Sequence, residues 1–281
     1  MRIGIDSYTI RELKLNAYES FDYVKKQGLE GIQFGGMNEL SKNGDIGELK
    51  DIKAYADSQL RTVISQYDER YVHPVPWDVH LLKSAKFVRS LRPVLAECGS
   101  RINLENHGDS TFDLLQVVEA VGEDICGICF DTANTLVNAE DPVLAAKRVA
   151  PYTHMSHCKD GLTFFTANGV SRQGKPPGQG VVDFAQIIPI LGAYNRDLRL
   201  SIEDHKMIFE FRIFDRDWMA KNPKLNSYEL GQYVKLAAEA EKRLARGELP
   251  GVDEYEAAPF VEEMEQRLTD GAAFLRGLLI R

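Results

Sequence analysis

The chain has 281 residues, of which 44% are hydrophobic and 27% charged, a composition typical of a soluble globular protein with a full core. Its net charge of −8 and its pI near 5.4 argue against a surface for nucleic acids or anionic membranes, which needs clustered basic residues. The chain has no apolar run of about 18 residues that would cross a bilayer, and its first residues read as a strand rather than a signal peptide. We therefore expect a cytoplasmic protein, with neither nucleic acid nor membrane among its partners.

Seven segments of the chain have the length and apolar pattern of β-strands, and segments with helical spacing separate them. The strands are predicted at residues 2–9, 31–36, 61–67, 101–107, 127–134, 153–160 and 199–205. Helices are predicted at residues 17–28, 79–99, 111–122, 141–150 and 183–194. Thr111, Asp141 and Asp183 suit N-cap or first-turn positions, and Pro142 lies where helices begin.

This alternation predicts parallel strands joined by crossover helices. A doubly wound sheet would have a Gly-rich phosphate turn after an early strand, and the sequence GGMNEL after the second strand does not match one. We therefore expect a (β/α)₈ TIM barrel over residues 1–205. Only seven strands are evident, and residues 68–100 are short for a full strand-helix-strand passage. The barrel is expected either to contain an irregular strand, around residues 71–77, or to lack one.

The last part of the chain differs in character. Residues 206–227 are rich in aromatic and charged side chains, and helical patterns follow at 228–247 and 257–279. The aromatic-rich segment has three interpretations: a lid over the mouth of the barrel, a dimer contact, or a loop that packs on the barrel. We expect residues 206–281 to be a C-terminal helical extension that packs on the barrel within the same domain.

Two of the four cysteines, Cys126 and Cys129, have CxxC spacing. They lie in an apolar segment predicted as a strand, where residues three apart point to opposite faces. We therefore expect buried thiols rather than a metal site.

Four consecutive predicted strands each end in a residue that can bind a metal: Glu105, Asp131, His157 and Glu203. In a parallel barrel the carboxyl ends of the strands share one face, where catalytic groups gather. The intervals between these residues each match one crossover, the last lengthened by a glycine-rich loop at 161–182. A single acidic residue at a strand end is more often an N-cap or an ion-pair partner, but the repetition on four strands favours a metal site.

Three carboxylates and one imidazole suit Mn²⁺, Co²⁺ or Mg²⁺, with Zn²⁺ as a further candidate, and they leave coordination positions for a substrate. Three negative ligands around one divalent cation leave a charge near −1. On this count a neutral polyol is easier to accept than an anion.

The motifs LENHGD, CFDTAN, SHCKDG, GQGVVDF and SIEDH resemble those of the xylose isomerase-like, or sugar phosphate isomerase/epimerase, TIM-barrel superfamily. The resemblance covers residues 1–205 and is strongest over 101–205. It points to the ketose 3-epimerases and inosose dehydratases of that superfamily. In the epimerases the matching Glu, Asp, His and Glu bind one divalent metal, often Mn²⁺. The resemblance therefore implies a manganese site at Glu105, Asp131, His157 and Glu203, with Glu105 and Glu203 also as acid/base residues on opposite sides of the substrate.

Such a site suits enolisation chemistry. A metal that binds a carbonyl oxygen and the neighbouring hydroxyl stabilises the enediolate that forms when the α-proton leaves. One carboxylate removes this proton, and another returns it on the same or the opposite face. We therefore expect an isomerase or epimerase of a ketose or keto-polyol.

Four further residues are candidates for binding the substrate. His107, Lys159 and His205 each follow a predicted ligand by two residues and share its face of the strand, and Asn134 stands where the ketose 3-epimerases have a histidine. The alternative for the two histidines is a surface or capping role. His107 is also a catalytic candidate, because a lyase must protonate or expel a leaving group.

Alternative functions remain open at the level of sequence. The epimerases have an arginine shortly after the metal-binding histidine, whereas this chain offers Lys159. A lyase with the same chemistry is therefore the first alternative, either an inosose-type dehydratase or a C–C cleaving enzyme on a 3-keto C-glycoside. A non-catalytic sugar-binding subunit is a further one. An endonuclease IV type of enzyme is disfavoured by only six histidines and a net charge of −8. We expect a homo-oligomer, with a second subunit as an alternative partner.

Overall fold

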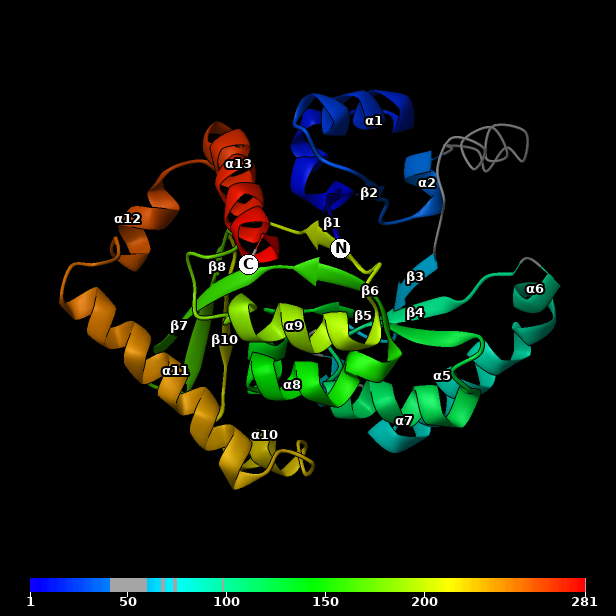
Figure 1. Ribbon diagram of the computed structural model, residues 1–281. Helices are drawn as coiled ribbons and strands as arrows, with labels where there is room; N and C mark the ends of the chain where they lie inside the picture. Colours follow the sequence, from blue (N-terminus) through cyan, green and yellow to red (C-terminus); the bar gives the residue numbers. More distant parts are fainter. Residues whose placement is uncertain (41–59, 67–68, 73–74, 98, 281) are drawn as a thin grey trace.

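A computed structural model describes residues 1–40, 60–66, 69–72, 75–97 and 99–280 of the chain (Figure 1). Tyr67, the last residue of a predicted strand, and Cys98, within a predicted helix, lie outside the described residues. Among the described helices, none combines the length and the apolar character needed to cross a membrane.

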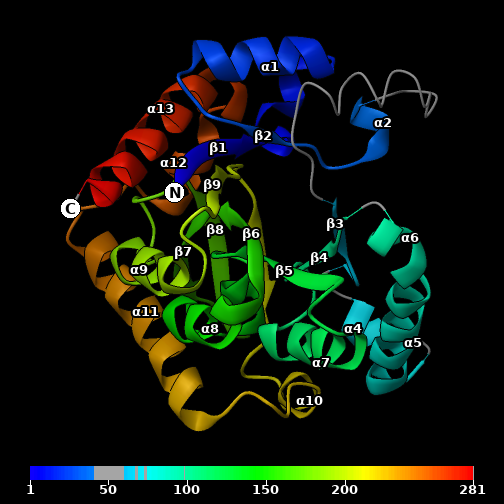
Figure 2. The same ribbon diagram turned by 45° about the vertical axis from the view of Figure 1, so that its right-hand side comes forward.

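Seven parallel strands form the central sheet, in the order β2-β1-β9-β6-β5-β4-β3. Figure 2 shows them as an arc inside a ring of helices. The strands are β1 (Arg2–Asp6), β2 (Ile32–Gln33), β3 (Leu60–Val63), β4 (Ile102–Glu105), β5 (Cys126–Asp131), β6 (Thr153–Cys158) and β9 (Arg199–Ile202). The first and last of them, β1 and β9, pair with each other, and no pairing of described residues joins β2 to β3. The predicted TIM barrel is thus confirmed, and over the described residues it is curled and open between β2 and β3.

Among the residues that the structure describes, no strand lies between β3 and β4. The described residues of this region form α4 (Glu69–Val72), α5 (Trp77–Ser90) and α6 (Arg92–Glu97), and β3 pairs directly with β4. The alternative of an irregular strand around residues 71–77 is therefore wrong for its described part, while positions 73–74 lie outside the description. The predicted helix at 79–99 is divided, because Pro93 has no N–H to continue the hydrogen-bond ladder beyond Leu91.

The crossover helices begin at the predicted signals. They are α1 (Ala17–Lys26), α7 (Thr111–Val121), α8 (Pro142–Val149) and α9 (Phe184–Tyr194). Asp141 and Asp183 are N-caps whose carboxylates accept backbone N–H groups, and Pro142 is the first residue of α8. Thr111 is the first residue of α7, behind a capping box formed by Ser110 and Asp113. These helices pack their apolar faces on the strands and complete the core.

A second, three-stranded antiparallel sheet was not predicted. It consists of β7 (Asp160–Phe165), β8 (Val170–Lys175) and β10 (Ile208–Phe211), in the order β10-β8-β7. The predicted glycine-rich loop at 161–182 is therefore a hairpin over most of its length, and the aromatic-rich segment 206–227 contains β10 and α10 (Arg216–Ala220). The hairpin follows directly after β6, so it starts beside the carboxyl end of the barrel strands.

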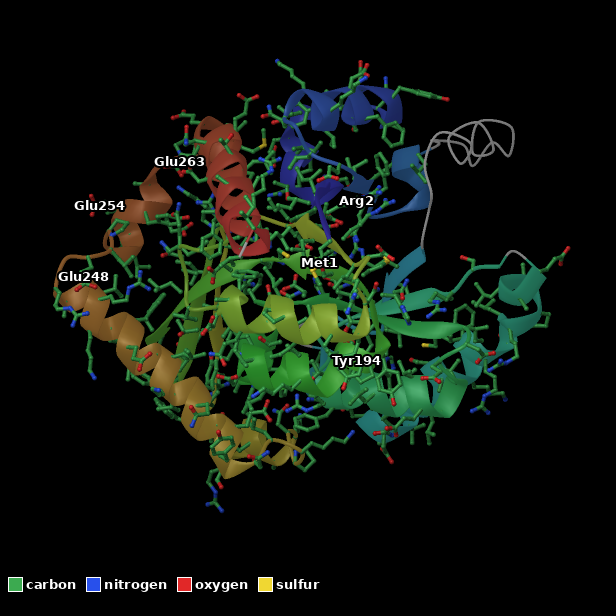
Figure 3. The ribbon with its side chains drawn as sticks, in the orientation of Figure 1. Met1, Arg2, Tyr194, Glu248, Glu254 and Glu263 are labelled. Carbon is green, nitrogen blue, oxygen red and sulfur yellow. The ribbon has the colours of Figure 1, made fainter. Side chains whose placement is uncertain are left out.

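The C-terminal helices run along the barrel. They are α11 (Ser227–Ala245), α12 (Val252–Ala257) and α13 (Phe260–Leu279), and Glu248, Glu254 and Glu263 mark their path in Figure 3. Helix α11 packs on β7, and α13 packs on β1, β9 and α9.

Candidate metal centre

The structure brings the four predicted metal ligands together. Glu105, Asp131 and His157 lie at the ends of the adjacent strands β4, β5 and β6, and Glu203 follows β9. One ligand atom of each residue lies within 4.8 Å of those of the others, and all four side chains are buried. The convergence follows from parallel pairing, which places Asp131 directly opposite His157.

The Nδ1 atom of His157 is the nitrogen that faces the carboxylates. It lies 2.6 Å from Glu203 Oε2, 3.1 Å from Glu105 Oε1 and 3.8 Å from Asp131 Oδ2. Burial alone would lower the pKa of His157, but the negative charges of Glu105 and Glu203 raise it well above its ordinary value. The negative groups around this imidazole therefore favour the binding of a positive charge beside it.

Lys159 lies against the same carboxylates. Its Nζ is 2.5 Å from Glu203 Oε1, 3.3 Å from Asp131 Oδ2 and 3.4 Å from Asn134 Oδ1. Although burial opposes it, the charges of Lys159 and His157 hold the pKa of Glu203 well below its ordinary value. Glu203 is therefore ionised at neutral pH.

The other three substrate-binding candidates also border the cluster. Asn134 donates its Nδ2–H to Glu105 Oε1 at 3.4 Å. His205 Nε2 lies 3.8 Å from Glu203 Oε1, and its ring packs edge-on against Tyr8. His107 is half-buried; burial lowers its pKa, and the charges of Glu105 and Lys159 act on it. Burial and the charge of Lys159 also lower the pKa of His205, so both imidazoles are neutral at pH 7.

Two residues that contact the candidate site were missed from the sequence. Arg61, on β3, forms ion pairs with Glu105 and, at 3.5 Å, with Asp6 Oδ2. Asp6, the last residue of β1, also lies 3.4 Å from Nε2 of His157. Asp6 satisfies the same strand-end rule that identified the ligands. Arg61 gave no such signal, because it lies inside its strand and reaches the site only through its length.

The charges of the site fit a divalent cation. Its four carboxylates and two cations leave a formal charge of −2 when His157 is neutral, which one divalent cation would neutralise. The count of three carboxylate ligands and one divalent cation gave −1. It omitted Asp6, Arg61 and Lys159, and with these included the metal-loaded site has a formal charge of zero. Burial alone would raise the pKa of Glu105, but the stronger effect of His157 and Arg61 lowers it to about 2. This carboxylate is therefore also ionised and able to bind a metal.

Replacing Asp6 with asparagine is expected to lower the affinity for a divalent metal by about 10–100-fold. Asp6 faces Nε2 of His157, so its charge favours the tautomer that leaves Nδ1 free for a metal. Asparagine retains the Oδ1 that accepts the Tyr8 N–H at 2.9 Å, so the turn after β1 is kept. Titration with Mn²⁺ followed by electron paramagnetic resonance measures the affinity, with the exposed Asp22→Asn as control. Equal affinities in the two variants would contradict this role.

The comparisons with known proteins agree with this architecture. Residues 65–221, more than half of the chain and including all four candidate ligands, match the family model described as xylose isomerase-like TIM barrel. No curated protein matched the chain.

Three solved structures illustrate the likeness. D-psicose 3-epimerase with D-tagatose from Clostridium cellulolyticum H10 has a TM-score of 0.58 at 14% identity and covers 99% of each chain. The IOLI protein with a binding zinc atom has a TM-score of 0.53 at 14% identity, over 86% of this chain and 96% of that one. The probable 3-DHS dehydratase AsbF from Bacillus anthracis has a TM-score of 0.52 at 14% identity, over 84% of this chain and 98% of that one. At 14% identity, these similarities show a shared fold and not a shared activity. The family match and the shared fold together show that the chain belongs to the xylose isomerase-like TIM barrel family.

Proposed function

We propose that the protein is a divalent-metal-dependent isomerase or epimerase of a ketose or keto-polyol, which moves an α-proton through an enediolate. The observation that carries this proposal is the convergence of Glu105, Asp131, His157 and Glu203 at the carboxyl edge of four adjacent parallel strands. The bound metal, Mn²⁺ in the first instance, would supply the Lewis acid that stabilises the negative charge of the enediolate.

The two glutamates are suited to proton transfer. Each has one carboxylate oxygen near Nδ1 of His157 and another held by a cation, Arg61 for Glu105 and Lys159 for Glu203. This arrangement fixes both carboxylates and keeps them ionised, so either can accept a proton from a substrate carbon. In an epimerase one glutamate removes the proton and the other returns it on the opposite face. His107, Asn134 and His205 would bind the hydroxyl groups of the substrate.

A lyase is the second candidate, and Lys159 favours it. This buried amine lies 2.5 Å from Glu203 Oε1, in the region where the epimerases have an arginine. An ammonium group beside the base can donate a proton to a departing hydroxyl or carbanion, which a simple epimerase does not need. The similar structures likewise include one named as an epimerase and one named as a dehydratase.

The experiment is metal analysis of the purified protein, followed by incubation in D₂O with a panel of ketoses and 3-keto sugars. One bound divalent metal and deuterium at the carbon beside the carbonyl would support enolisation. The products then decide between the candidates, because an epimerase returns an isomer and a lyase returns a smaller or dehydrated molecule. Absence of bound metal after reconstitution with Mn²⁺, Co²⁺, Mg²⁺ or Zn²⁺ would overturn the proposal. A homo-oligomer and a cytoplasmic location remain predictions, to be checked by light scattering and cell fractionation.

A further inference from the structure

The β7–β8 hairpin contains a fully buried arginine without a counter-charge among the described residues. The three guanidinium nitrogens of Arg172 are buried and make no hydrogen bond there, and its closest described partner is the ring of Phe209, 5.2 Å from Cζ. The other two buried arginines, Arg70 and Arg267, each bind a carboxylate, of Asp113 and Asp204 respectively. Because a buried and unpaired charge is costly, Arg172 needs an explanation that its own fold does not provide.

The side chain of Arg172 runs along the hairpin toward the start of β7, where the chain leaves β6. Its cross-strand partner is Thr163, but its stem lies over Gly161, where an added Cβ would be 2.7 Å from Arg172 Cδ. Gly161 is two residues nearer to the end of β6, so the stem points back toward Lys159. On the same face of β8, Gly174 lies against the backbone carbonyl of His205, 2.1 Å from where its Cβ would be. The hairpin face that bears Arg172 therefore lies against the backbone of His205, two residues after Glu203.

Further polar atoms without a described partner gather around this arginine. They are Oγ1 of Thr163 opposite it on β7, the hydroxyl of the fully buried Tyr233 on α11, and Nδ1 of His205. The charge of Arg172 acts on both Tyr233 and His205. Hydroxyl and imidazole groups are hydrogen-bond donors, so together with the guanidinium they could surround one anion.

The charge count favours a ligand with one negative charge. The metal-loaded centre is formally neutral, and Arg172 adds one positive charge that forms no ion pair with a carboxylate among the described residues. The planar guanidinium fork matches a carboxylate in a bidentate manner. A carboxylate would balance this charge, whereas a phosphate monoester carries close to two negative charges at neutral pH.

We propose that the substrate is a keto sugar acid, and that Arg172 binds its carboxylate while its carbonyl group lies at the metal centre. The inference rests on the proposed function for the position of the carbonyl, and on the unpaired guanidinium for the acid. It reverses the preference for a neutral polyol that the ligand charges alone suggested.

The test compares D-fructose with D-fructuronate, which differ only in having a hydroxymethyl or a carboxylate group at C6. Isothermal titration calorimetry on the Mn²⁺-loaded protein is expected to show about 10–100-fold tighter binding of the acid, since hydrogen bonds to charged groups are the strong ones. Arg172→Met should abolish this preference. Arg172→Lys, which keeps the charge but not the fork, should retain part of it. Tighter binding of D-fructose 6-phosphate than of D-fructuronate would overturn the assignment to a carboxylate.

Thermal melting without ligand separates a binding role from a structural one. Because Arg172 has no carboxylate partner within the described fold, Arg172→Met is expected to melt at the same or a higher temperature than the wild type. Arg70→Met, which removes the buried partner of Asp113 and leaves it only the half-exposed Lys224 as a cation among the described residues, is the matched control and should melt lower. A large fall in melting temperature for Arg172→Met, with an unchanged ligand preference, would overturn the inference.

The failures of the two proposals are distinguishable. Equal or absent binding of both sugars by a protein that holds a metal would overturn the keto acid and leave the enolisation chemistry to the D₂O experiment. A protein that holds no metal but binds D-fructuronate through Arg172 would overturn the proposed function and support the anion site.

Discussion

Glu203→Gln is expected to lower the rate of deuterium exchange into the substrate by about 10²–10⁴-fold at saturating metal. The glutamine amide cannot accept the α-proton, and it removes the charge that Lys159 Nζ contacts at 2.5 Å. The measurement is the incorporation of deuterium by mass spectrometry, with the bound metal quantified in the same sample. Metal affinity also falls, because one of four ligands is weakened.

Two further variants separate the role of base from that of ligand. Asp131→Asn weakens a ligand that has no proposed part in proton transfer, so added metal should restore most of its exchange. Glu239→Gln, at an exposed position on α11, is the matched control and should behave as wild type. Recovery of exchange by metal in Glu203→Gln, to the level of Asp131→Asn, would show that Glu203 acts only as a ligand.

The convergence of the four candidate ligands was predictable because the signal is local. Each of the four residues ends an apolar segment of strand length, and parallel pairing then requires the four ends to meet. Asp6 carries the same signal at the end of β1 and could have been found in the same way. Arg61 could not, since nothing in the sequence says that a side chain in mid-strand reaches the strand end.

The hairpin was missed although part of its signal is present. Asn168 and Gly169 between two alternating segments are a strong hairpin indication, and the frequent glycines were instead interpreted as a loop. The burial of β8 was beyond sequence reasoning. Its residues, Val170–Lys175, are mostly polar and read as exposed, and yet all six are buried. Strand β8 lies between β7 and β10, and Gln173 on it contacts Val252 and Glu256 of α12, so pairings with distant parts of the chain decide this burial.

Arg267→Ala is expected to lower the free energy of unfolding by about 3–5 kcal/mol, the usual cost of breaking a buried ion pair from one side. Arg267, on α13, donates to Asp204 through Nε at 2.7 Å and Nη2 at 2.6 Å, and both side chains are buried. Asp204 stands between Glu203 and His205 in the chain. The pair therefore joins the C-terminal helix to the strand end that bears the proposed ligand Glu203, and the variant should also lose metal affinity. Urea unfolding and a Mn²⁺ titration measure the two effects.

The control is Arg246→Ala, whose ion pair with Glu248 is exposed and should contribute at most about 1 kcal/mol. In the double variant of Asp204→Ala and Arg267→Ala the loss should be smaller than the sum of the single losses, because neither charge is then left buried alone. If residues 206–281 form one domain with the barrel, as we propose, every variant unfolds in a single transition. Two transitions, or a loss for Arg267→Ala no larger than that of the control, would mean that the extension folds independently and that Glu203 is positioned by the barrel alone.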